Sequence, residues 1–357
     1  MIPTRKALNT VPHDGRPACH YCGHCMEACD VGAIFTVPGS MLPKAQKTGN
    51  FTLLQNRIGR ELVLDGNGRI RAISTVDTVT RAQGEVRARV FAVCCGAIES
   101  PRLLLNSRSS RYPNGVANSN DVVGRYLHGH INAGLLAYLE GLVGSRPVNN
   151  DGAMDHSYIP RFNLGGKKKD YAGGFQYQLQ DYGFMFPEHA RHLKGFGSKF
   201  KQQVRFLQPG FLGIDCFGKV LATPRNRVTV DRASTDVYGI PIPVVRFRFS
   251  ENDVALWRDM KTHAQELLHT AKSRLIVDTN KEPDGFASHE VGTVRMGTDP
   301  RTSVLNGHCQ SHEIPNLFVV DGSCFPTFPE KNPTLTIMAL AVRAARYMRE
   351  SSRKGEL

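Results

Sequence analysis

The strongest constraint on the fold comes from two short apolar runs that each end in a glycine and are followed by a helical pattern. The first run, VFAVCCG, ends at Gly96, and the following segment, AIESPRLLLNS, places Pro101 near the first turn of a predicted helix. The second run, NLFVVDG, ends at Asp321-Gly322 and precedes NPTLTIMALAVRAARYMRES, a predicted helix with Pro333 at its first position. Apolar runs without polar alternation are typical of strands buried on both faces. The sequence therefore predicts an α/β fold.

Other segments predict antiparallel structure. ELVLDGNGRIRAISTV alternates around Asp65-Gly66-Asn67-Gly68, which is a strong hairpin signal. NRVTVDRASTDVYGIPIPVVRFRF predicts strands with turn breaks, and ENDVALWRDMKTHAQELLHTAKSR predicts an amphipathic helix capped by Ser250 or Asn252. We expect a second lobe, built on a largely antiparallel sheet, to be inserted into the first. The predicted segments are a cysteine-rich loop region (1–45), the first part of the α/β domain (46–129), the inserted lobe (130–284) and the return to the first domain (285–357).

The composition is that of a folded globular protein. The 357 residues suit one large domain or two lobes, and the fractions of hydrophobic (41%) and charged (22%) residues are near globular averages. No window approaches twenty apolar residues, and the first residues lack the apolar core of a secretory signal, so we expect neither a membrane span nor an export signal in these residues. The net charge of +13 would attract an acidic partner or surface. The basic segments carry no nucleic-acid fold signature, and no nucleic-acid partner is expected.

Four cysteines near the start of the chain, in ACHYCGHCMEACD, share the spacing C-x2-C-x2-C-x3-C of bacterial ferredoxin cluster ligands. They are Cys19, Cys22, Cys25 and Cys29. Asp30 stands where ferredoxins have proline. Structural zinc is the alternative, held by the four thiolates or by a mixture that includes His20 and His24. An odd total of nine cysteines in a chain of this length does not indicate a disulfide framework. The spacing predicts a metal site and leaves the metal open.

Several motifs resemble the signatures of the glucose-methanol-choline (GMC) oxidoreductase family of flavoproteins. The C-terminal part carries H-x-x-G-T-x-R-M-G, N-L-F-V-V-D-G-S and N-P-T-L-T-I within some sixty residues. CCGAIESPRLLLNS is similar to the family's second signature, with Arg108 in place of the usual small residue, and LPKAQKTGN and VGRYLHGH also match. The resemblance implies a Rossmann-like FAD-binding domain, incomplete in this chain, with an inserted antiparallel-sheet substrate domain.

The resemblance also implies which residues act on the substrate, an alcohol whose hydride passes to the flavin. By motif position these residues are His289 and Asn332. A neutral imidazole suits removal of the hydroxyl proton, and a carboxamide can donate a hydrogen bond to the developing alkoxide. Taken without its motif, His289 would be read as a core histidine that satisfies a hydrogen bond. His130, in VGRYLHGH, matches a family histidine that we interpret as structural.

A further set of residues is implied to lie beside the flavin. They are Gly96, Ala97, Asp321, Gly322, Pro333 and Thr334. For Gly96 and Ala97 an ordinary strand-to-helix turn is an equally good interpretation. The helix from Thr334 would direct its positive end at the edge of the ring system where negative charge collects on reduction.

The resemblance is closest to the bacterial branch of gluconate and cytochrome-linked sugar dehydrogenases. Members of the cytochrome-linked group hold a three-iron cluster with three cysteines at the spacing x5 then x3, which here selects Cys19, Cys25 and Cys29. Cys22 is then spare or a fourth ligand. The resemblance therefore favours an iron-sulfur cluster, 3Fe-4S or 4Fe-4S, over zinc. Such a cluster would pass single electrons to a cytochrome or a quinone-type acceptor.

One expected motif is absent from the sequence. Full-length members begin with a strand, a G-x-G-x-x-G turn and a helix that bind the ADP half of FAD, and these 357 residues contain no G-x-G-x-x-G. We therefore expect this chain to be the rear portion of a longer flavoprotein, and one interpretation is that a separate polypeptide supplies the front. The alternatives are a truncated product that binds flavin weakly or not at all, and a metal-binding, non-catalytic remnant of the family. The substrate is expected to be a sugar, a sugar acid or another alcohol.

Overall fold

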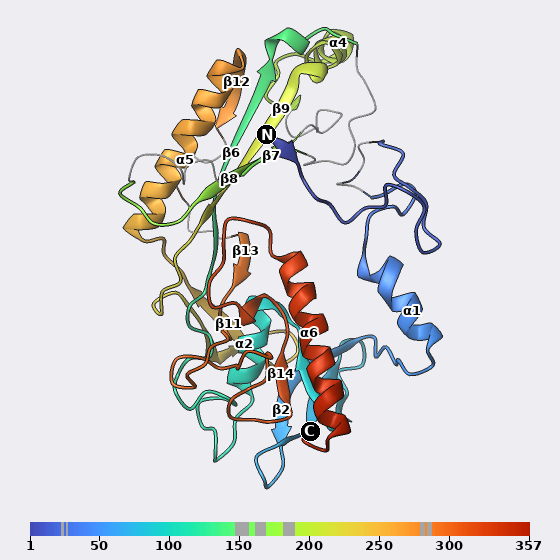
Figure 1. The fold of residues 1–357 in the computed structure, drawn as a ribbon, viewed down its shortest axis with the longest axis vertical. Coiled ribbons are helices and arrows are strands. Elements are labelled where there is room, and N and C mark those ends of the chain that lie inside the picture. The colour runs from blue at the N-terminus through green and yellow to red at the C-terminus, as the bar shows by residue number, and fades with distance from the viewer. Residues whose placement is uncertain are drawn as a thin grey trace. The chain divides into compact units, whose positions relative to one another are not determined.

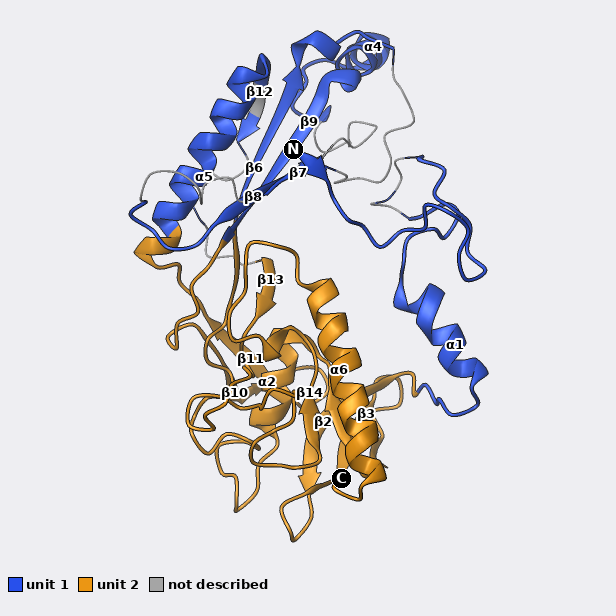
Figure 2. Ribbon diagram, in the orientation of Figure 1, with its two compact units in different colours: residues 1–53, 132–218, 254–284 blue, residues 54–131, 219–253, 285–357 orange. Residues whose placement is uncertain are grey.

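The structure, a computed structural model, describes residues 1–22, 25, 28–146, 157–160, 169–180, 190–278, 283 and 288–357. The chain forms two compact units (Figure 2). Unit 1 comprises residues 1–53, 132–218 and 254–284, and unit 2 comprises residues 54–131, 219–253 and 285–357. The predicted segments differ from these units mainly at residues 219–253, which we expected in the inserted lobe. The functional assignment of the segments stays a prediction.

Unit 2 contains both strand-glycine-helix patterns. Strand β5 (Phe91–Val93) pairs in parallel with β14 (Leu317–Val319), and every residue of β14 is fully buried. Helix α2 (Gly96–Asn106) follows β5, and the short 3₁₀ helix η5 (Gly322–Cys324) follows β14. Figure 1 labels α2 and β14. A buried parallel pair with a helix after its first strand confirms the predicted α/β fold.

Helix α6 (Thr334–Arg353) is the longest helix of unit 2, and Pro333 is its N-cap rather than its first residue. The sequence pattern predicts that one apolar face packs, formed by Leu335, Met338, Val342, Ala345 and Met348. This prediction is wrong for Leu335 and Val342, whose side chains are 78% and 51% exposed. The stripe that packs against the core instead includes Ile337, Leu340, Ala341, Ala344 and Tyr347. Apolar residues cover more than one side of this helix, so helical periodicity could not select the buried side.

The remaining strands of unit 2 are antiparallel. β2 (Arg57–Leu64), β3 (Ile70–Asp77) and β4 (Gln83–Arg87) form a three-stranded sheet, and β10 (Arg227–Thr235) pairs with β11 (Pro241–Arg246). The predicted hairpin is confirmed: the Asp65 carboxylate accepts hydrogen bonds from the backbone N–H groups of Asn67 and Arg69, each 2.9 Å long. Asp65 thereby closes the turn between β2 and β3.

Unit 1 is built on an antiparallel sheet, as the sequence predicts for the inserted lobe. Its strand order is β1-β7-β8-β9-β6-β12, with β13 also paired to β6. The strands are β1 (Ile2–Pro3), β6 (His128–Leu139), β7 (Ser157–Ile159), β8 (Phe175–Gln180), β9 (Phe211–Lys219), β12 (Ser273–Asp278) and β13 (Ser288–Val291). The first four residues of β6, and all of β13, belong to unit 2.

Helix α5 (Glu251–Thr270) packs on the sheet of unit 1, where the Tyr177 hydroxyl donates a hydrogen bond of 2.7 Å to the carbonyl oxygen of Met260. Of the two predicted caps, Ser250 and Asn252, Ser250 makes the reciprocal contact: its hydroxyl accepts from the N–H of Asp253, while the Asp253 carboxylate accepts from the N–H of Ser250. The other helices are η1 (Val37–Met41), α1 (Leu42–Lys47), η2 (Glu140–Leu142), α4 (Gly197–Leu207) and η4 (Gln208–Gly210). Within the described ranges, no helix combines the length and hydropathy needed to cross a bilayer.

Candidate active site

His289 lies in an irregular stretch of strand β13. Ser288 is opposite His130 and Val291 is opposite His128, so three residue steps on β13 face two steps on β6. The extra residue makes a bulge, and His289 has a φ of +62°, in the left-handed region that non-glycine residues rarely occupy. Gly129 permits this approach, because a Cβ atom there would lie 2.6 Å from the Ser288 carbonyl oxygen. The bulge accompanies the contact between the His289 ring and His130.

A chain of hydrogen bonds runs through His130 and His289. His130 Nε2 lies 2.8 Å from the carbonyl oxygen of Pro329, and His130 Nδ1 lies 3.0 Å from His289 Nδ1. His289 Nε2 lies 3.4 Å from the Nδ2 atom of Asn332. The His130 ring also stacks on Phe328, with centroids 4.6 Å apart, and meets the His289 ring edge-on at 5.0 Å. Three elements thus fix the His289 ring: β6, β13 and the loop before α6.

Burial sets the protonation of both rings. His130 is fully buried, and burial lowers its pKa to about 3. Burial also lowers the pKa of the half-buried His289 below its ordinary value. Both imidazoles are therefore neutral at pH 7. Asn332 is exposed at the end of this chain of hydrogen bonds, so a neutral imidazole and a carboxamide lie side by side where a small molecule can reach the carboxamide.

The structure therefore brings His289 and Asn332 together, as the motifs predict, and their catalytic roles stay predictions. Sequence reasoning missed the contact of His130 with His289. The available signal was the period-2 spacing of His128 and His130 in VGRYLHGH, which places both side chains on one face of a strand. Their partner across the ladder could not be identified from that spacing.

Asp321 joins the two turns that follow the parallel strands. One carboxylate oxygen accepts from the N–H of Gly96 (2.9 Å) and the hydroxyl of Ser100 (2.5 Å). The other accepts from the N–H (2.8 Å) and the hydroxyl (2.5 Å) of Ser323. Gly96 has a φ of +84°, a conformation suited to glycine. Asp321 and Gly96 are thus neighbours, and the buried carboxylate holds the backbone of both turns in place.

Steric contacts and a hydrogen bond explain why glycine or threonine stands at several positions near His289. A Cβ atom at Gly292, where φ is +99°, would lie 2.4 Å from both His128 Nδ1 and the Tyr126 carbonyl oxygen. A Cβ atom at Gly322 would lie 3.0 Å from the Glu290 carbonyl oxygen. Thr293 donates its hydroxyl hydrogen bond to the buried Ala97 carbonyl oxygen at 2.7 Å, which ties the His289 segment to the first turn of α2. Gly96, Ala97, Asp321 and Gly322 therefore form one connected patch, and Pro333 and Thr334 lie beside Asn332 at the start of α6.

The four cysteines of the N-terminal run lie in unit 1; all four are half-buried, and none is in a disulfide bond. Burial raises the pKa of Cys29, but hydrogen bonds from nearby backbone N–H groups outweigh burial and hold it below its ordinary value. Among the residues with described positions, the one set of three possible metal ligands within 4.8 Å of one another is His20, Cys22 and Asp30. The structure thus does not draw the four sulfurs into such a close set. His24 lies outside the described residues.

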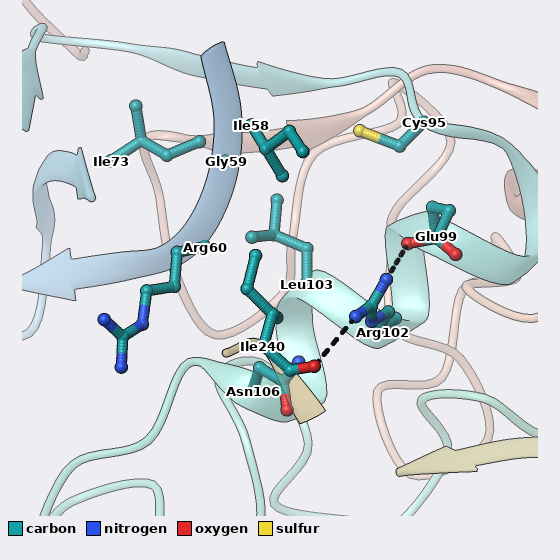
Figure 3. A pocket seen from close by; sticks show the side chains of 10 residues that line it. All are labelled: Ile58, Gly59, Arg60, Ile73, Cys95, Glu99, Arg102, Leu103, Asn106 and Ile240. Carbon is teal, nitrogen blue, oxygen red and sulfur yellow. Dashed lines mark hydrogen bonds and ion pairs between the residues drawn. The ribbon is translucent and has the colours of Figure 1, made fainter. Parts of the chain in front are cut away.

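A cavity of about 300 Å³ lies elsewhere in unit 2, between the sheet of β2 and β3 and helix α2 (Figure 3). Arg102 forms its polar wall through contacts to Glu99 (3.0 Å) and to the Ile240 carbonyl oxygen (3.1 Å). Cys95, the residue before Gly96, lines the same cavity. Neither His289 nor Asn332 does, so the cavity is not the place where these two side chains would meet a substrate.

The segments that carry these motifs also match known proteins. The N- and C-terminal domain models of the GMC oxidoreductase family match residues 7–132 and 222–341. The 2-methyl-1,2-propanediol dehydrogenase of Mycolicibacterium austroafricanum is 32% identical, over 97% of this chain and 63% of that protein. The fructose dehydrogenase large subunit of Gluconobacter japonicus is 29% identical, over 96% of this chain and 62% of that protein. The chain thus spans less than two thirds of the length of these relatives.

Solved structures give the same fold. The crystal structure of pyridoxine 4-oxidase from Mesorbium loti aligns with a TM-score of 0.61 at 19% identity and covers 89% of this chain and 62% of that one. At this identity the likeness concerns the fold alone. The alignment supports the Rossmann-like α/β architecture with an antiparallel sheet.

Proposed function

Because this chain belongs to the GMC oxidoreductase family, we propose that it forms the substrate-binding and catalytic part of an FAD-dependent dehydrogenase. The reaction is the oxidation of a CH–OH group in a sugar, a sugar acid or another alcohol. The observation that carries the proposal is the 3.4 Å approach of His289 Nε2 to Asn332 Nδ2 next to the start of α6. Relatives named as a propanediol dehydrogenase and a fructose dehydrogenase subunit support an alcohol or sugar as substrate.

The residues divide the chemistry between them. His289 is neutral at pH 7 and accepts the hydroxyl proton of the substrate, since burial holds its pKa below the ordinary value. Asn332 donates a hydrogen bond to the oxygen as negative charge develops on it. When bound, FAD supplies the acceptor for the hydride that leaves the carbinol carbon.

The residues near this pair fit a flavin. The first N–H groups of a helix have no partner within the helix, and α6 begins two residues after Asn332, so these donors and the positive helix end suit the electron-rich edge of the ring. Gly96, at the start of α2, lacks the side chain that would keep a ligand away from the backbone, and no atom lies within 4 Å of its Cβ position. We infer that Gly96, Ala97, Asp321, Gly322, Pro333 and Thr334 hold the flavin, with Asp321 shaping the turns rather than binding directly.

We further propose that polypeptide outside these 357 residues completes the flavin site. Two observations support this step. No G-x-G-x-x-G turn occurs in the sequence. Leu335 and Val342 leave an apolar stripe exposed on α6. Additional polypeptide that packed on this stripe would bury it, just as the core of unit 2 buries the other side of α6.

For the electron acceptor we propose an iron-sulfur cluster held by Cys19, Cys22, Cys25 and Cys29, with a cytochrome or quinone-type molecule beyond it. The four half-buried thiols and the lowered pKa of Cys29 suit thiolate ligands. The second candidate is a flavin-free, non-catalytic metal protein. The short distances among His20, Cys22 and Asp30 favour it, since a mixed set of nitrogen, sulfur and oxygen donors suits zinc.

The absorption spectrum of the purified chain tests these proposals, together with acid-released flavin and metal analysis, before and after incubation with FAD. Bound flavin with iron would support the dehydrogenase. Zinc without flavin uptake would support the second candidate. A chain that takes up neither flavin nor metal would contradict the second candidate and would show that these residues alone do not hold the flavin.

Substitution of Asn332 tests its role. In flavin-loaded protein, Asn332→Ala should lower kcat/KM for alcohol oxidation by about 10²–10³, the usual effect of removing one donor to a developing oxyanion. Dye reduction at several substrate concentrations measures this, and flavin content serves as the control. Unchanged kcat/KM at unchanged flavin content would remove Asn332 from the mechanism.

A further inference from the structure

The two ring nitrogens of His130 have partners of different kinds. Nε2 lies 2.8 Å from the carbonyl oxygen of Pro329, which can only accept a hydrogen bond, so Nε2 must carry a hydrogen atom. His130 is fully buried among Phe328 and the strands, where a charged ring is strongly disfavoured. A neutral imidazole has one N–H only. The Nδ1 atom of His130 therefore carries no hydrogen atom and presents a lone pair.

This assignment determines the state of His289. The two Nδ1 atoms lie 3.0 Å apart, and a hydrogen bond between them needs one hydrogen atom. Because His130 Nδ1 has none, His289 Nδ1 must donate. The neutral ring of His289 then has no hydrogen atom on Nε2, and that lone pair accepts the weak hydrogen bond from Asn332 Nδ2 at 3.4 Å.

We propose that His130 is a positioning residue that holds His289 in the Nδ1–H tautomer and so keeps the Nε2 lone pair of His289 on the side of Asn332. The catalytic meaning of this inference rests on the proposed function, since Nε2 is then the atom that takes the substrate proton. Without His130, an imidazole in water favours the opposite tautomer, with the hydrogen atom on Nε2. That tautomer cannot act as a base at this position.

The arrangement around His130 is rigid enough to enforce this choice. Its ring stacks on Phe328 with an angle of 15° between the planes, and its backbone is held in the ladder opposite Ser288. Pro329 O is a backbone atom three residues before Asn332, so one short loop supplies both ends of the hydrogen-bond chain. A displacement of this loop would therefore alter the tautomer and the carboxamide together.

Imidazole tautomers can be read without flavin or turnover. In the ¹⁵N-histidine-labelled chain at about pH 7.5, long-range ¹H–¹⁵N correlation spectra distinguish protonated from unprotonated ring nitrogens. We expect a protonated Nδ1 and an unprotonated Nε2 for His289, and the reverse for His130. Signals are assigned by their loss in His289→Gln and His130→Gln. A His289 ring with its hydrogen atom on Nε2 in the unsubstituted chain would overturn the proposal.

Two variants of His130 separate positioning from packing. Gln offers a carboxamide N–H to Pro329 and an oxygen to His289, so His130→Gln should preserve the Nδ1–H tautomer of His289. His130→Phe keeps a ring against Phe328 but no acceptor, and the Nε2 signal of His289 should shift toward the protonated position. An unshifted signal in a folded His130→Phe chain would contradict the inference. His308→Gln, on a ring that stacks on Tyr347 instead, is the matched control and should leave His289 unchanged.

These outcomes are separate from those of the proposed function. If the tautomers are as expected and the flavin-loaded protein oxidises no alcohol, the function fails and the positioning role of His130 stands. If His130→Phe does not fold, the spectra of the unsubstituted chain and of His130→Gln still test which ring nitrogen of His289 carries the hydrogen atom.

Discussion

The candidate catalytic pair and the candidate metal ligands lie in two regions that are built differently. In the His289 region each ring nitrogen has a partner from another element, at 2.8, 3.0 and 3.4 Å along the chain from Pro329 to Asn332. In the cysteine run, two of the sulfurs accept hydrogen bonds from backbone N–H groups nearby in the sequence: Cys19 accepts from Tyr21, and Cys29 accepts from Ile34. Long-range strand pairing thus preorganises the first region. No described residue of the cysteine run belongs to a strand, so a bound metal would have to fix the positions of its ligands.

The largest effect that this comparison predicts is on turnover. In flavin-loaded protein, His289→Ala should lower kcat by about 10²–10⁴, since loss of a general base typically costs this much. Stopped-flow measurement of flavin reduction by substrate isolates the step. His308→Ala, outside the site, should leave the rate unchanged. Equal rates in the His289 variant and the parent would show that a preorganised histidine pair is not by itself a catalytic one.

The second effect is on acid stability and comes from the buried histidines. Burial lowers the pKa of His128 to about 4 and that of His130 to about 3, while the pKa of a histidine in the unfolded chain is about 6.5. At His128 the Tyr126 carbonyl and Asp253 oppose burial, and Arg295 and Lys219 reinforce it.

Below pH 6.5 the unfolded state therefore binds more protons than the folded state, and stability falls as the pH falls through this window. At pH 5 each ring should cost about 2 kcal/mol relative to pH 8. Urea unfolding at both pH values measures the loss, and His130→Gln should remove about half of the histidine contribution. A variant with an unchanged pH dependence would argue that the His130 ring is not buried in the neutral form.

The third effect is steric and confined to the His289 region. Gly292→Ala would place a Cβ atom 2.4 Å from His128 Nδ1 and from the Tyr126 carbonyl oxygen, at a φ of +99°. We expect a loss of about 3 kcal/mol in the free energy of unfolding, from backbone strain and overpacking together. Gly307→Ala is the matched control, because no atom lies within 4 Å of its Cβ position. If both variants unfold at the same denaturant concentration, the backbone around His289 is looser than its contacts indicate.

The same contrast explains what the sequence could predict. Apolar runs that end in glycine were enough to predict the two buried strands and the α/β fold, because strand burial is visible in the local sequence pattern. That the two strands pair in parallel came from the structure alone. His289 and Asn332 were found through motifs. The contact of His130 with His289 was missed because it depends on a bulge that joins residues 159 positions apart. The buried side of α6 was missed because its apolar residues cover more than one face.

The smallest effects on stability are expected in the cysteine run. In the metal-free chain, Cys29→Ser and His20→Ala should each change the free energy of unfolding by less than about 1 kcal/mol, as is usual for substitutions away from a packed core.

The same two substitutions should differ in their effect on the metal content of the protein. If a cluster is held by the four cysteines, Cys29→Ser should remove the bound iron and His20→Ala should leave it, whereas a zinc site at His20, Cys22 and Asp30 would show the reverse. Elemental analysis of both variants, with Cys94→Ser as an exposed cysteine outside the run, decides between them. A metal content that neither substitution changes would mean that the metal, unlike the His289 pair, does not depend on this run.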